Sequence, residues 1–443
     1  MRTLLSNAHV VTMDEGGTEY SNGWVLMDGG FIEDVGDGPP PPAEAFDNLG
    51  GALVTPGLVN THHHLFQALT RTRAQESDLF GWLETLYPLW ARIDAGAEYA
   101  AARAGLAELA LSGCTTVFDH HYVFPNGAKG LVEAEIEAAN EIGVRLTASR
   151  GSMDLGESEG GLPPDVLVEE MRHVLRDTER LAALHEPGPG ARIQIAVAPC
   201  SPFSVTKKLM IESAALARDL GLRLHTHLAE TVEEEEYCLG VFGCRPIEYL
   251  EQVGWLEGDV WCAHCVHLEE EDVARFREAG TGVAHCPTSN MRLGAGIAPV
   301  AAMCARGVPV GLGVDGPASN ERSDLLLEAK QALLVARARG GPQAMAVRQA
   351  FRLATRGGAA VLGREDIGSL EPGKCADIAV WWPWELEFGG ADDPLAALVL
   401  SAPHRVHRLY VGGEEVVRDG RLTHADEAEI SAEHRRQAQR FLT

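Results

Sequence analysis

The sequence has little positive charge. Its 443 residues include 37 lysines and arginines against 64 aspartates and glutamates, a formal net charge of −27. A surface with this excess repels the phosphates of nucleic acids and the anionic headgroups of membranes. We therefore expect neither partner, and we interpret the acidic excess as a solvated surface that favours solubility.

Long hydrophobic runs and a disulfide pattern are also missing. No stretch approaches the ~20 apolar residues that span a bilayer, and the first residues contain no apolar core of a signal peptide. The nine cysteines are odd in number and scattered through the chain, which does not fit a disulfide framework. These features predict a protein of the reducing cytoplasm.

Several catalytic signatures are absent as well. No Gly-x-Gly-x-x-Gly turn follows an early strand, which argues against a dinucleotide-binding sheet. The Gly-x-Ser-x-Gly spelling at 156–160 lies in an acidic, glycine-rich loop without the strand and helix of a nucleophile elbow. A second cysteine pair to complete a zinc knot is missing, so we expect no ligand role for Cys262, Cys265 or Cys286.

The central part of the sequence alternates β-rich runs with amphipathic segments of helical length. This alternation is typical of a parallel α/β fold, and eight strands is the number that closes a (β/α)8 barrel of the TIM type. An open doubly wound sheet is the alternative, but the polar residues are spread over many strand ends. The eight candidate strands are 57–61, 115–119, 145–149, 193–198, 222–228, 260–263, 281–285 and 308–314. Helical spacing of apolar residues predicts helices within 100–111, 166–184, 207–220 and 269–279.

The two ends of the chain share a different sequence pattern, with short β-rich runs and glycine turns. We expect them to pair into a small β-sandwich domain outside the barrel. The predicted organisation is a composite β-domain of 1–55 and 366–420, a barrel of 56–365 and a helical tail of 421–443. The acidic run 233–236 is interpreted as the opening turn of a solvated helix, where carboxylates favour the positive end of the helix dipole.

Imidazole and carboxylate side chains follow several of the predicted strands. His62 and His64 are two residues apart, so on a strand they point to the same side and reach one cation. His225 or His227 offers another ligand, and Asp315 ends an apolar run where its carboxylate needs a cation or hydrogen bonds. The strand ends of such a barrel meet at one mouth. The pattern predicts a divalent metal site with an open position for water.

Two more polar residues belong to this constellation. Glu230 lies just beyond the strand that carries His227, within reach of a substrate nitrogen, and His264 ends the next predicted strand. Taken alone, His264 could be a buried histidine satisfied by the backbone.

In this order, the motifs resemble those of the amidohydrolase superfamily, in the branch of cytosine deaminases, adenosylhomocysteine deaminases and triazine hydrolases. The resemblance covers nearly the whole chain. The segments that carry it are 56–64, 227–230, His264, 285–290, Asp315 and 370–377. Segments that look closer to the bacterial 8-oxoguanine deaminase group are 60–67, 119–125, 150–153 and 198–205.

The resemblance implies roles for these residues. It makes His62, His64, His227 and Asp315 the ligands of one divalent metal, most simply Zn2+, and leaves His225 as a flanking residue. It makes Glu230, His264 and Asp315 catalytic. Many relatives bridge two metals with a modified lysine on the fourth strand, but 193–199 contains no lysine. One metal is therefore expected.

The implied reaction is hydrolytic deamination of an amino-substituted purine, 8-oxoguanine being converted to urate and ammonia. Isocytosine, pterin or s-triazine hydrolysis on the same site is the enzymatic alternative, and a non-catalytic binding protein is the alternative from another class. The resemblance also implies a homo-oligomer. Three residues are candidates for binding the heteroaromatic substrate: Gln67, Trp82 and His121. Each has a plain structural reading: a first-turn helix residue, a core aromatic, and the end of a strand.

Overall fold

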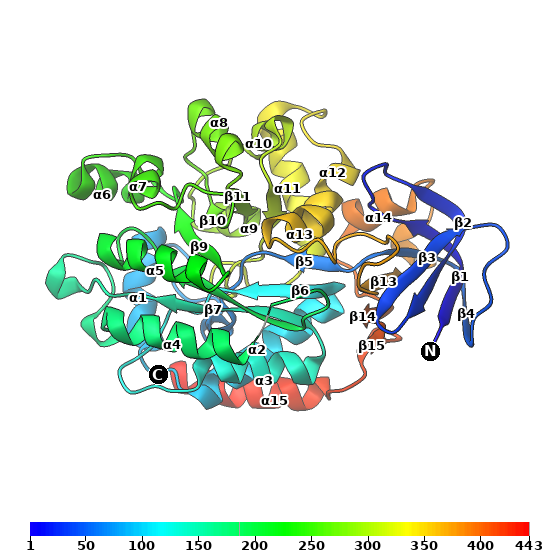
Figure 1. Cartoon of the computed structure of the whole chain (residues 1–443), viewed down its shortest axis with the longest axis horizontal. Helices are drawn as coiled ribbons and strands as arrows, with labels where there is room; N and C mark the ends of the chain where they lie inside the picture. Colours follow the sequence, from blue (N-terminus) through cyan, green and yellow to red (C-terminus); the bar gives the residue numbers. More distant parts are fainter. Residues whose placement is uncertain (186, 443) are drawn as a thin grey trace.

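Eight short parallel strands close into a barrel in the computed structural model of the protein, which describes residues 1–185 and 187–442 (Figure 1). They lie around the barrel in chain order, and the last pairs with the first through Leu312 and Asn60. All eight predicted strands are confirmed. Their bounds are Leu58–Asn60 (β5), Cys114–Asp119 (β6), Arg145–Ser152 (β7), Ile193–Pro199 (β8), Arg223–Leu228 (β9), Val260–His264 (β10), Gly282–His285 (β11) and Val310–Leu312 (β12).

The barrel interior is packed with aromatic side chains below its carboxyl-terminal mouth. Phe118 and Trp261 are fully buried, and their rings meet edge to face with centroids 4.7 Å apart. Nε1 of Trp261 donates a hydrogen bond to the backbone oxygen of Thr61 at 3.1 Å, which ties β10 to the end of β5. Above this aromatic layer, the polar residues at the strand ends line the mouth.

Helices surround the barrel, as the alternating sequence pattern predicts. Their bounds are Leu79–Trp90 (α1), Ala95–Leu111 (α2), Leu131–Ile142 (α3), Met171–Leu184 (α4), Lys207–Asp219 (α5), Val232–Phe242 (α6), Pro246–Gln252 (α7), Glu270–Ala279 (α8), Pro287–Arg292 (α9), Val300–Arg306 (α10), Leu325–Gly340 (α11), Val347–Arg352 (α12), Gly358–Val361 (α13), Pro394–Ser401 (α14) and Glu427–Ala438 (α15). Side-chain caps fix several starts: Asp94 accepts from the backbone N–H of Ala97 at α2, and Thr231 accepts from that of Glu234 at α6.

The two ends of the chain share one eight-stranded mixed sheet beside the barrel, in the order β16-β15-β14-β13-β4-β1-β2-β3 (Figure 1). β1 pairs with β4 in parallel, and β13 pairs with the other edge of β4 antiparallel. β4 then leads directly into barrel strand β5. The bounds are Thr3–Val11 (β1), Glu19–Asp28 (β2), Phe31–Asp37 (β3), Ala45–Pro56 (β4), Ile378–Trp381 (β13), Arg408–Val411 (β14), Glu414–Arg418 (β15) and Arg421–Leu422 (β16).

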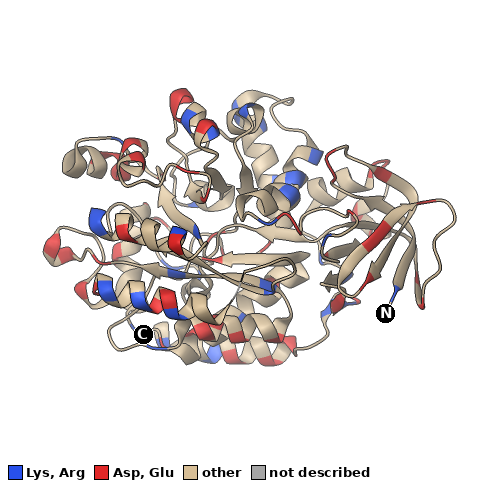
Figure 2. Ribbon diagram, in the orientation of Figure 1, with Lys and Arg blue, Asp and Glu red and all other residues tan. Residues whose placement is uncertain are grey.

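Buried polar contacts join the sheet and the last helix to the barrel. The guanidinium of Arg145 in β7 pairs with Asp377 at 2.7 Å. α15 packs along α2, where Arg103 pairs with Glu433 at 2.9 Å (Figure 1). Acidic residues are distributed over the outer helices and the terminal sheet, with lysines and arginines among them (Figure 2). Of the helices in the described residues, none has the length and apolar character to cross a membrane.

Candidate metal centre and active site

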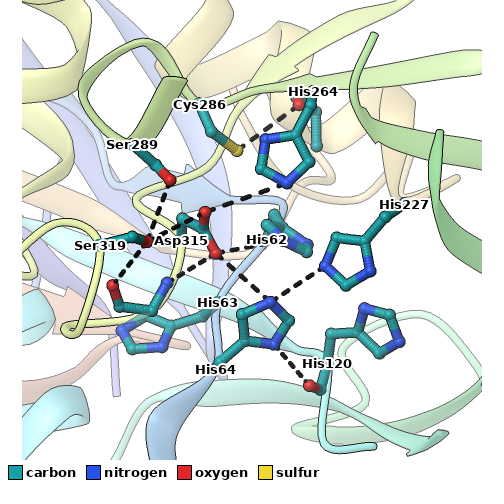
Figure 3. A network of polar contacts seen from close by, with 12 residues as sticks. His62, His63, His64, His120, His227, His264, Cys286, Ser289, Asp315 and Ser319 are labelled. Atoms are coloured by element: carbon teal, nitrogen blue, oxygen red, sulfur yellow. Dashed lines mark hydrogen bonds and ion pairs between the residues drawn. The ribbon is translucent and has the colours of Figure 1, made fainter. Parts of the chain in front are cut away.

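Three histidines converge at the carboxyl-terminal mouth of the barrel. His62 and His64 follow β5, and His227 lies in β9. All three are buried, and Nε2 of His64 lies 3.1 Å from Nε2 of His227. Figure 3 shows the three rings and Asp315 directed toward one another from separate segments. Tertiary structure thus brings together side chains that are more than 160 positions apart in the sequence.

Hydrogen bonds determine which ring nitrogen of His64 and His227 is free. A carbonyl oxygen only accepts, so the nitrogen that faces one must carry the proton. Nδ1–H of His64 donates to the backbone oxygen of His120 at 2.7 Å. Nδ1–H of His227 donates to the backbone oxygen of Cys200, also at 2.7 Å. In the neutral rings, Nε2 therefore carries a lone pair.

The same reasoning applies to His62 through one more residue. Nδ1–H of His225 donates to the backbone oxygen of Trp261 at 3.0 Å, so Nε2 of His225 is an acceptor. It accepts from Nδ1–H of His62 at 2.9 Å. Nε2 of His62 is then the unprotonated nitrogen, and it has no hydrogen-bond partner among the described residues. His225 thus orients His62 from behind, and its own ring nitrogens are both in use.

Asp315 completes the constellation from the segment after β12. Its Oδ1 lies 3.3 Å from Nε2 of His64 and 3.4 Å from Nε2 of His62, whereas Oδ2 lies 3.9 Å from Nε2 of His264 (Figure 3). The hydroxyl of Ser319 donates to Oδ2 at 3.3 Å. Asp315 has a φ of 62° and His264 one of 70°, a left-handed conformation that costs an L-residue about 1–3 kcal/mol and is typical of functional sites.

These residues fit a divalent metal ion. Four ligands at about 2.0–2.1 Å around a tetrahedral ion are separated from one another by roughly 3.4 Å, close to the 3.1–3.4 Å separations found here. Burial lowers the pKa of His64 and His227 well below the usual value, which keeps them in the neutral form that binds metals. Lone pairs that face one another at 3.1 Å without a proton between them require a cation to be stable.

Glu230 and His264 lie beside this centre. Oε2 of Glu230 is 3.6 Å from Nε2 of His264, and Nδ1–H of His264 donates to Oδ1 of Asn290 at 2.9 Å. Burial raises the pKa of Glu230 to about 7, so its carboxyl exchanges a proton near neutral pH. Burial opposes protonation of His264, but the carboxylates of Glu230 and Asp315 outweigh it and raise its pKa.

The start of α6 positions Glu230. The acidic run predicted for the opening turn of this helix does lie there, but Glu234 is fully buried rather than solvated. Its carboxylate oxygens accept hydrogen bonds from the backbone N–H groups of Ala229 and Glu230, each at 2.8 Å. Desolvation of a carboxylate is offset here by charge-assisted hydrogen bonds. Glu234 thus fixes the backbone from which the Glu230 side chain projects.

A pocket opens beside the candidate metal centre. Gln67 and Trp82, two of the three candidate substrate-binding residues, line it. Oε1 of Gln67 is buried and has no partner in the described part of the chain, whereas Nε1 of Trp82 donates to the backbone oxygen of Ala318. The residues that line the pocket are His64, Gln67, Leu79, Trp82, Leu83, Tyr87, Tyr122, Cys200, Phe203, His227, Glu230, His264, Leu293, Asp315 and Ser319.

His121, the third candidate, lies outside this lining. Its ring is fully buried behind the mouth, where it packs against Phe66 and Phe124 and approaches two glutamates. His120, its neighbour, instead stacks on His227 with ring centroids 4.7 Å apart. Successive residues of an extended segment point to opposite sides, so His120 faces His227 while His121 faces away from it.

Sequence reasoning assigned no role to His120, Asn290 or Tyr87. His120 belongs to the same cluster of possible ligand atoms as His62, His64 and His227. Tyr87 lines the pocket, and its buried hydroxyl finds no hydrogen-bond partner within the described ranges. Asn290 stands in the His285–Asn290 motif, a signal that could have identified it. In the part of the chain that the structure describes, no candidate metal cluster includes a cysteine.

Comparison with known proteins gives matches over nearly the whole chain. The model of the amidohydrolase family matches residues 53–416. An 8-oxoguanine deaminase of Pseudomonas aeruginosa is 48% identical over 431 residues, which cover 96% of each chain. An isoxanthopterin deaminase of an unknown prokaryotic organism is 37% identical over 94% of this chain and 91% of its own length.

Two solved structures also match over nearly the whole chain. The atrazine chlorohydrolase TrzN from Arthrobacter aurescens TC1, crystallised with zinc, superimposes with a TM-score of 0.94 at 33% identity, over 98% of this chain and all of the other. An amidohydrolase from an environmental sample of the Sargasso Sea gives a TM-score of 0.85 at 33% identity over 100% and 99%. The sequence comparisons and the structure comparisons therefore place this chain in the same large family.

Proposed function

The chain belongs to the amidohydrolase family, and we propose that it is a zinc-dependent deaminase that converts 8-oxoguanine to urate and ammonia. The observation that carries the proposal is the convergence of three Nε2 lone pairs and one carboxylate beside Glu230 and His264 in a buried pocket. The 48% identity to an 8-oxoguanine deaminase supports the choice of substrate.

In this proposal the zinc is held by His62, His64, His227 and Asp315. A bound zinc lowers the pKa of a water ligand toward neutrality and so supplies the nucleophile at physiological pH. The buried histidines offer neutral imidazoles, and their Nδ1–H groups are anchored by backbone oxygens or by His225. Such partners orient metal-binding rings and raise their basicity.

Asp315 and His264 act on the attacking water. Oδ1 of Asp315 faces the histidines and Oδ2 faces His264, so one oxygen binds while the other takes up the proton of the water. Nε2 of His264 faces the same space. Protonated on Nε2 beside the carboxylate of Asp315, it donates a hydrogen bond to the oxygen that gains negative charge during attack on carbon 2.

Glu230 acts on the ring. With a pKa near 7, its carboxyl group gives a proton to the ring nitrogen next to carbon 2, so that attack does not leave an uncompensated anion on the ring. Asp315 then passes its proton to the amino group, and the bond between carbon 2 and that nitrogen breaks. The proton of the remaining hydroxyl returns to Glu230 as the carbonyl forms on carbon 2 and ammonia leaves. Water replaces the amino group with oxygen, which turns 8-oxoguanine into urate.

The pocket suits a flat heteroaromatic ring with polar edges. Trp82, Tyr122 and Phe203 supply flat apolar surface. The amide of Gln67 and the hydroxyl of Tyr87 present unpaired polar atoms that hydrogen-bond to ring nitrogens and carbonyl oxygens.

The test measures ammonia release by zinc-loaded protein from 8-oxoguanine, guanine, isocytosine and isoxanthopterin, and chloride release from a chlorotriazine. We expect 8-oxoguanine to give the highest kcat/KM, and Glu230→Gln and Asp315→Asn to lose turnover. A higher kcat/KM on isoxanthopterin or a triazine would replace the substrate assignment and leave the metal site in place. Zinc binding without turnover of any ring would support a binding protein instead.

A further inference from the structure

A second group of possible metal ligands lies behind the active-site mouth. Glu98 projects from α2, Glu135 from α3, and His121 from the segment after β6. Their ligand atoms all lie within 4.8 Å of one another, and all three residues are fully buried. None of the three lines the pocket. The cluster is therefore separate from the site of the proposed reaction.

The polar atoms of this cluster face one another without hydrogen bonds. Nε2–H of His121 donates to the backbone oxygen of Val123 at 2.9 Å, so Nδ1 of the neutral ring carries a lone pair. Nδ1 lies 2.9 Å from Oε1 of Glu135 and 3.7 Å from Oε2 of Glu98. Among the described residues, neither this nitrogen nor any of the four carboxylate oxygens has a hydrogen-bond partner.

Burial raises the pKa of Glu98 and of Glu135 well above the usual value, so these two carboxyls stay ionised only beside a cation. Burying an unpaired carboxylate costs several kcal/mol, about as much as a whole domain gains from folding. The guanidinium of Arg150 is already used: it pairs with Glu169 and Asp177 at 2.8 and 2.7 Å. Among the ion pairs of the described residues, those of Glu98 and Glu135 involve the imidazole of His121 alone.

We propose that Glu98, His121 and Glu135 bind a second divalent ion, of the zinc type. Two carboxylate oxygens and one imidazole nitrogen are a ligand set that zinc accepts, with bonds of about 2.0–2.2 Å. The separations of 2.9 and 3.7 Å bracket the roughly 3.4 Å expected between ligands of a tetrahedral ion. The inference rests on these residues alone and stands whether or not the chain deaminates 8-oxoguanine.

An ion at this place would be structural. It would tie α2 and α3 to the segment after β6, and that segment supplies the backbone oxygen of His120 that holds the ring of His64. The second ion thus connects the outer helices to a ligand of the first. Its loss is expected to loosen this connection and to lower the thermal stability of the protein.

Zinc stoichiometry of the full-length protein tests the proposal. Metal-free protein is reconstituted with zinc, dialysed, and its zinc counted by plasma mass spectrometry. Wild type should hold two ions per chain, Glu135→Gln one and His64→Asn one. A double variant should hold none. Glu133→Gln, on the same helix with a half-exposed side chain, is the matched control and should keep two.

One zinc per chain in wild type, lost in His64→Asn and unchanged in Glu135→Gln, would overturn the inference. Because Glu135→Gln could fold poorly, wild-type crystals give a second measurement. An anomalous difference peak at the zinc edge between His121, Glu98 and Glu135 is expected. A map with a peak at His62, His64 and His227 only would contradict the proposal, and neither result depends on the assayed substrate.

Discussion

Asn290 accepts a hydrogen bond from Nδ1–H of His264 at 2.9 Å. Asn290 lies on α9 and His264 at the end of β10, so the contact joins two consecutive β/α units at the mouth. It holds the ring with Nε2 directed at Glu230 and Asp315. In the proposed mechanism, a ring that is oriented before substrate arrives loses no rotational freedom in the transition state.

Replacing Asn290 tests this positioning role. We expect Asn290→Ala to lower kcat about 10–100-fold with little change in KM, because the His264 ring loses its orientation and not its contact with substrate. Zinc content should stay at the wild-type value. Asn290→Asp, which keeps the acceptor, should recover most of the activity. A variant that loses zinc along with activity would show that Asn290 supports the fold of the mouth instead.

The pKa of Glu230 predicts a limb of the pH profile. Burial raises this pKa to about 7, so the carboxyl is protonated below that pH and ionised above it. Since the ring nitrogen needs the proton, kcat/KM should fall as pH rises through about 7. In Glu230→Gln the rate should drop about 100–10,000-fold and this limb should vanish. A wild-type profile that stays level from pH 6 to pH 9 would refute the role.

His225 should influence metal affinity without touching the metal. It accepts the Nδ1–H of His62, and removing such a partner costs about 10–100-fold in metal affinity. His225→Ala should therefore bind zinc more weakly than wild type but more tightly than His62→Ala. Competition with a zinc chelator measures both constants. Equal loss in the two variants would make His225 a ligand in its own right.

Gly316 keeps space for the amide of Gln67. A Cβ at Gly316 would lie 1.9 Å from Oε1 of Gln67, closer than any contact allows. Gly316→Ala should displace this amide and raise KM for 8-oxoguanine, with zinc content unchanged. Gln67→Ala should give a similar KM, and the double variant no further increase, because both changes remove one contact. If the two increases in KM added up in the double variant, Gly316 and Gln67 would affect substrate binding independently.

The sequence predicts much of the fold and the centre of the site. Eight β-rich runs alternate with helical ones, and a barrel brings their ends to one mouth, so His62, His227 and Asp315 were predictable as neighbours. Glu234 shows what a local sequence pattern cannot predict. Its place at a helix start was predictable. Its burial, with hydrogen bonds from two backbone N–H groups, depends on the turn at Ala229, which only the tertiary structure fixes.

His121 and Tyr87 show the same limit at the pocket. One position along the segment after β6 decides whether a ring faces His227 or two buried glutamates, and the run of histidines does not encode that register. Tyr87 lines the pocket because α1 lies beside the mouth. Contacts of this kind come from helix placement, which a local sequence pattern does not determine.

The most direct test follows urate as metal-free protein is titrated with zinc in the presence of 8-oxoguanine. Urate formation should appear with zinc binding and be absent in His64→Asn. In Glu230→Gln, zinc should still bind while urate formation is lost. If wild-type protein fills its His62, His64 and His227 centre with zinc and forms no urate, the chain is an amidohydrolase of another substrate and the central claim fails.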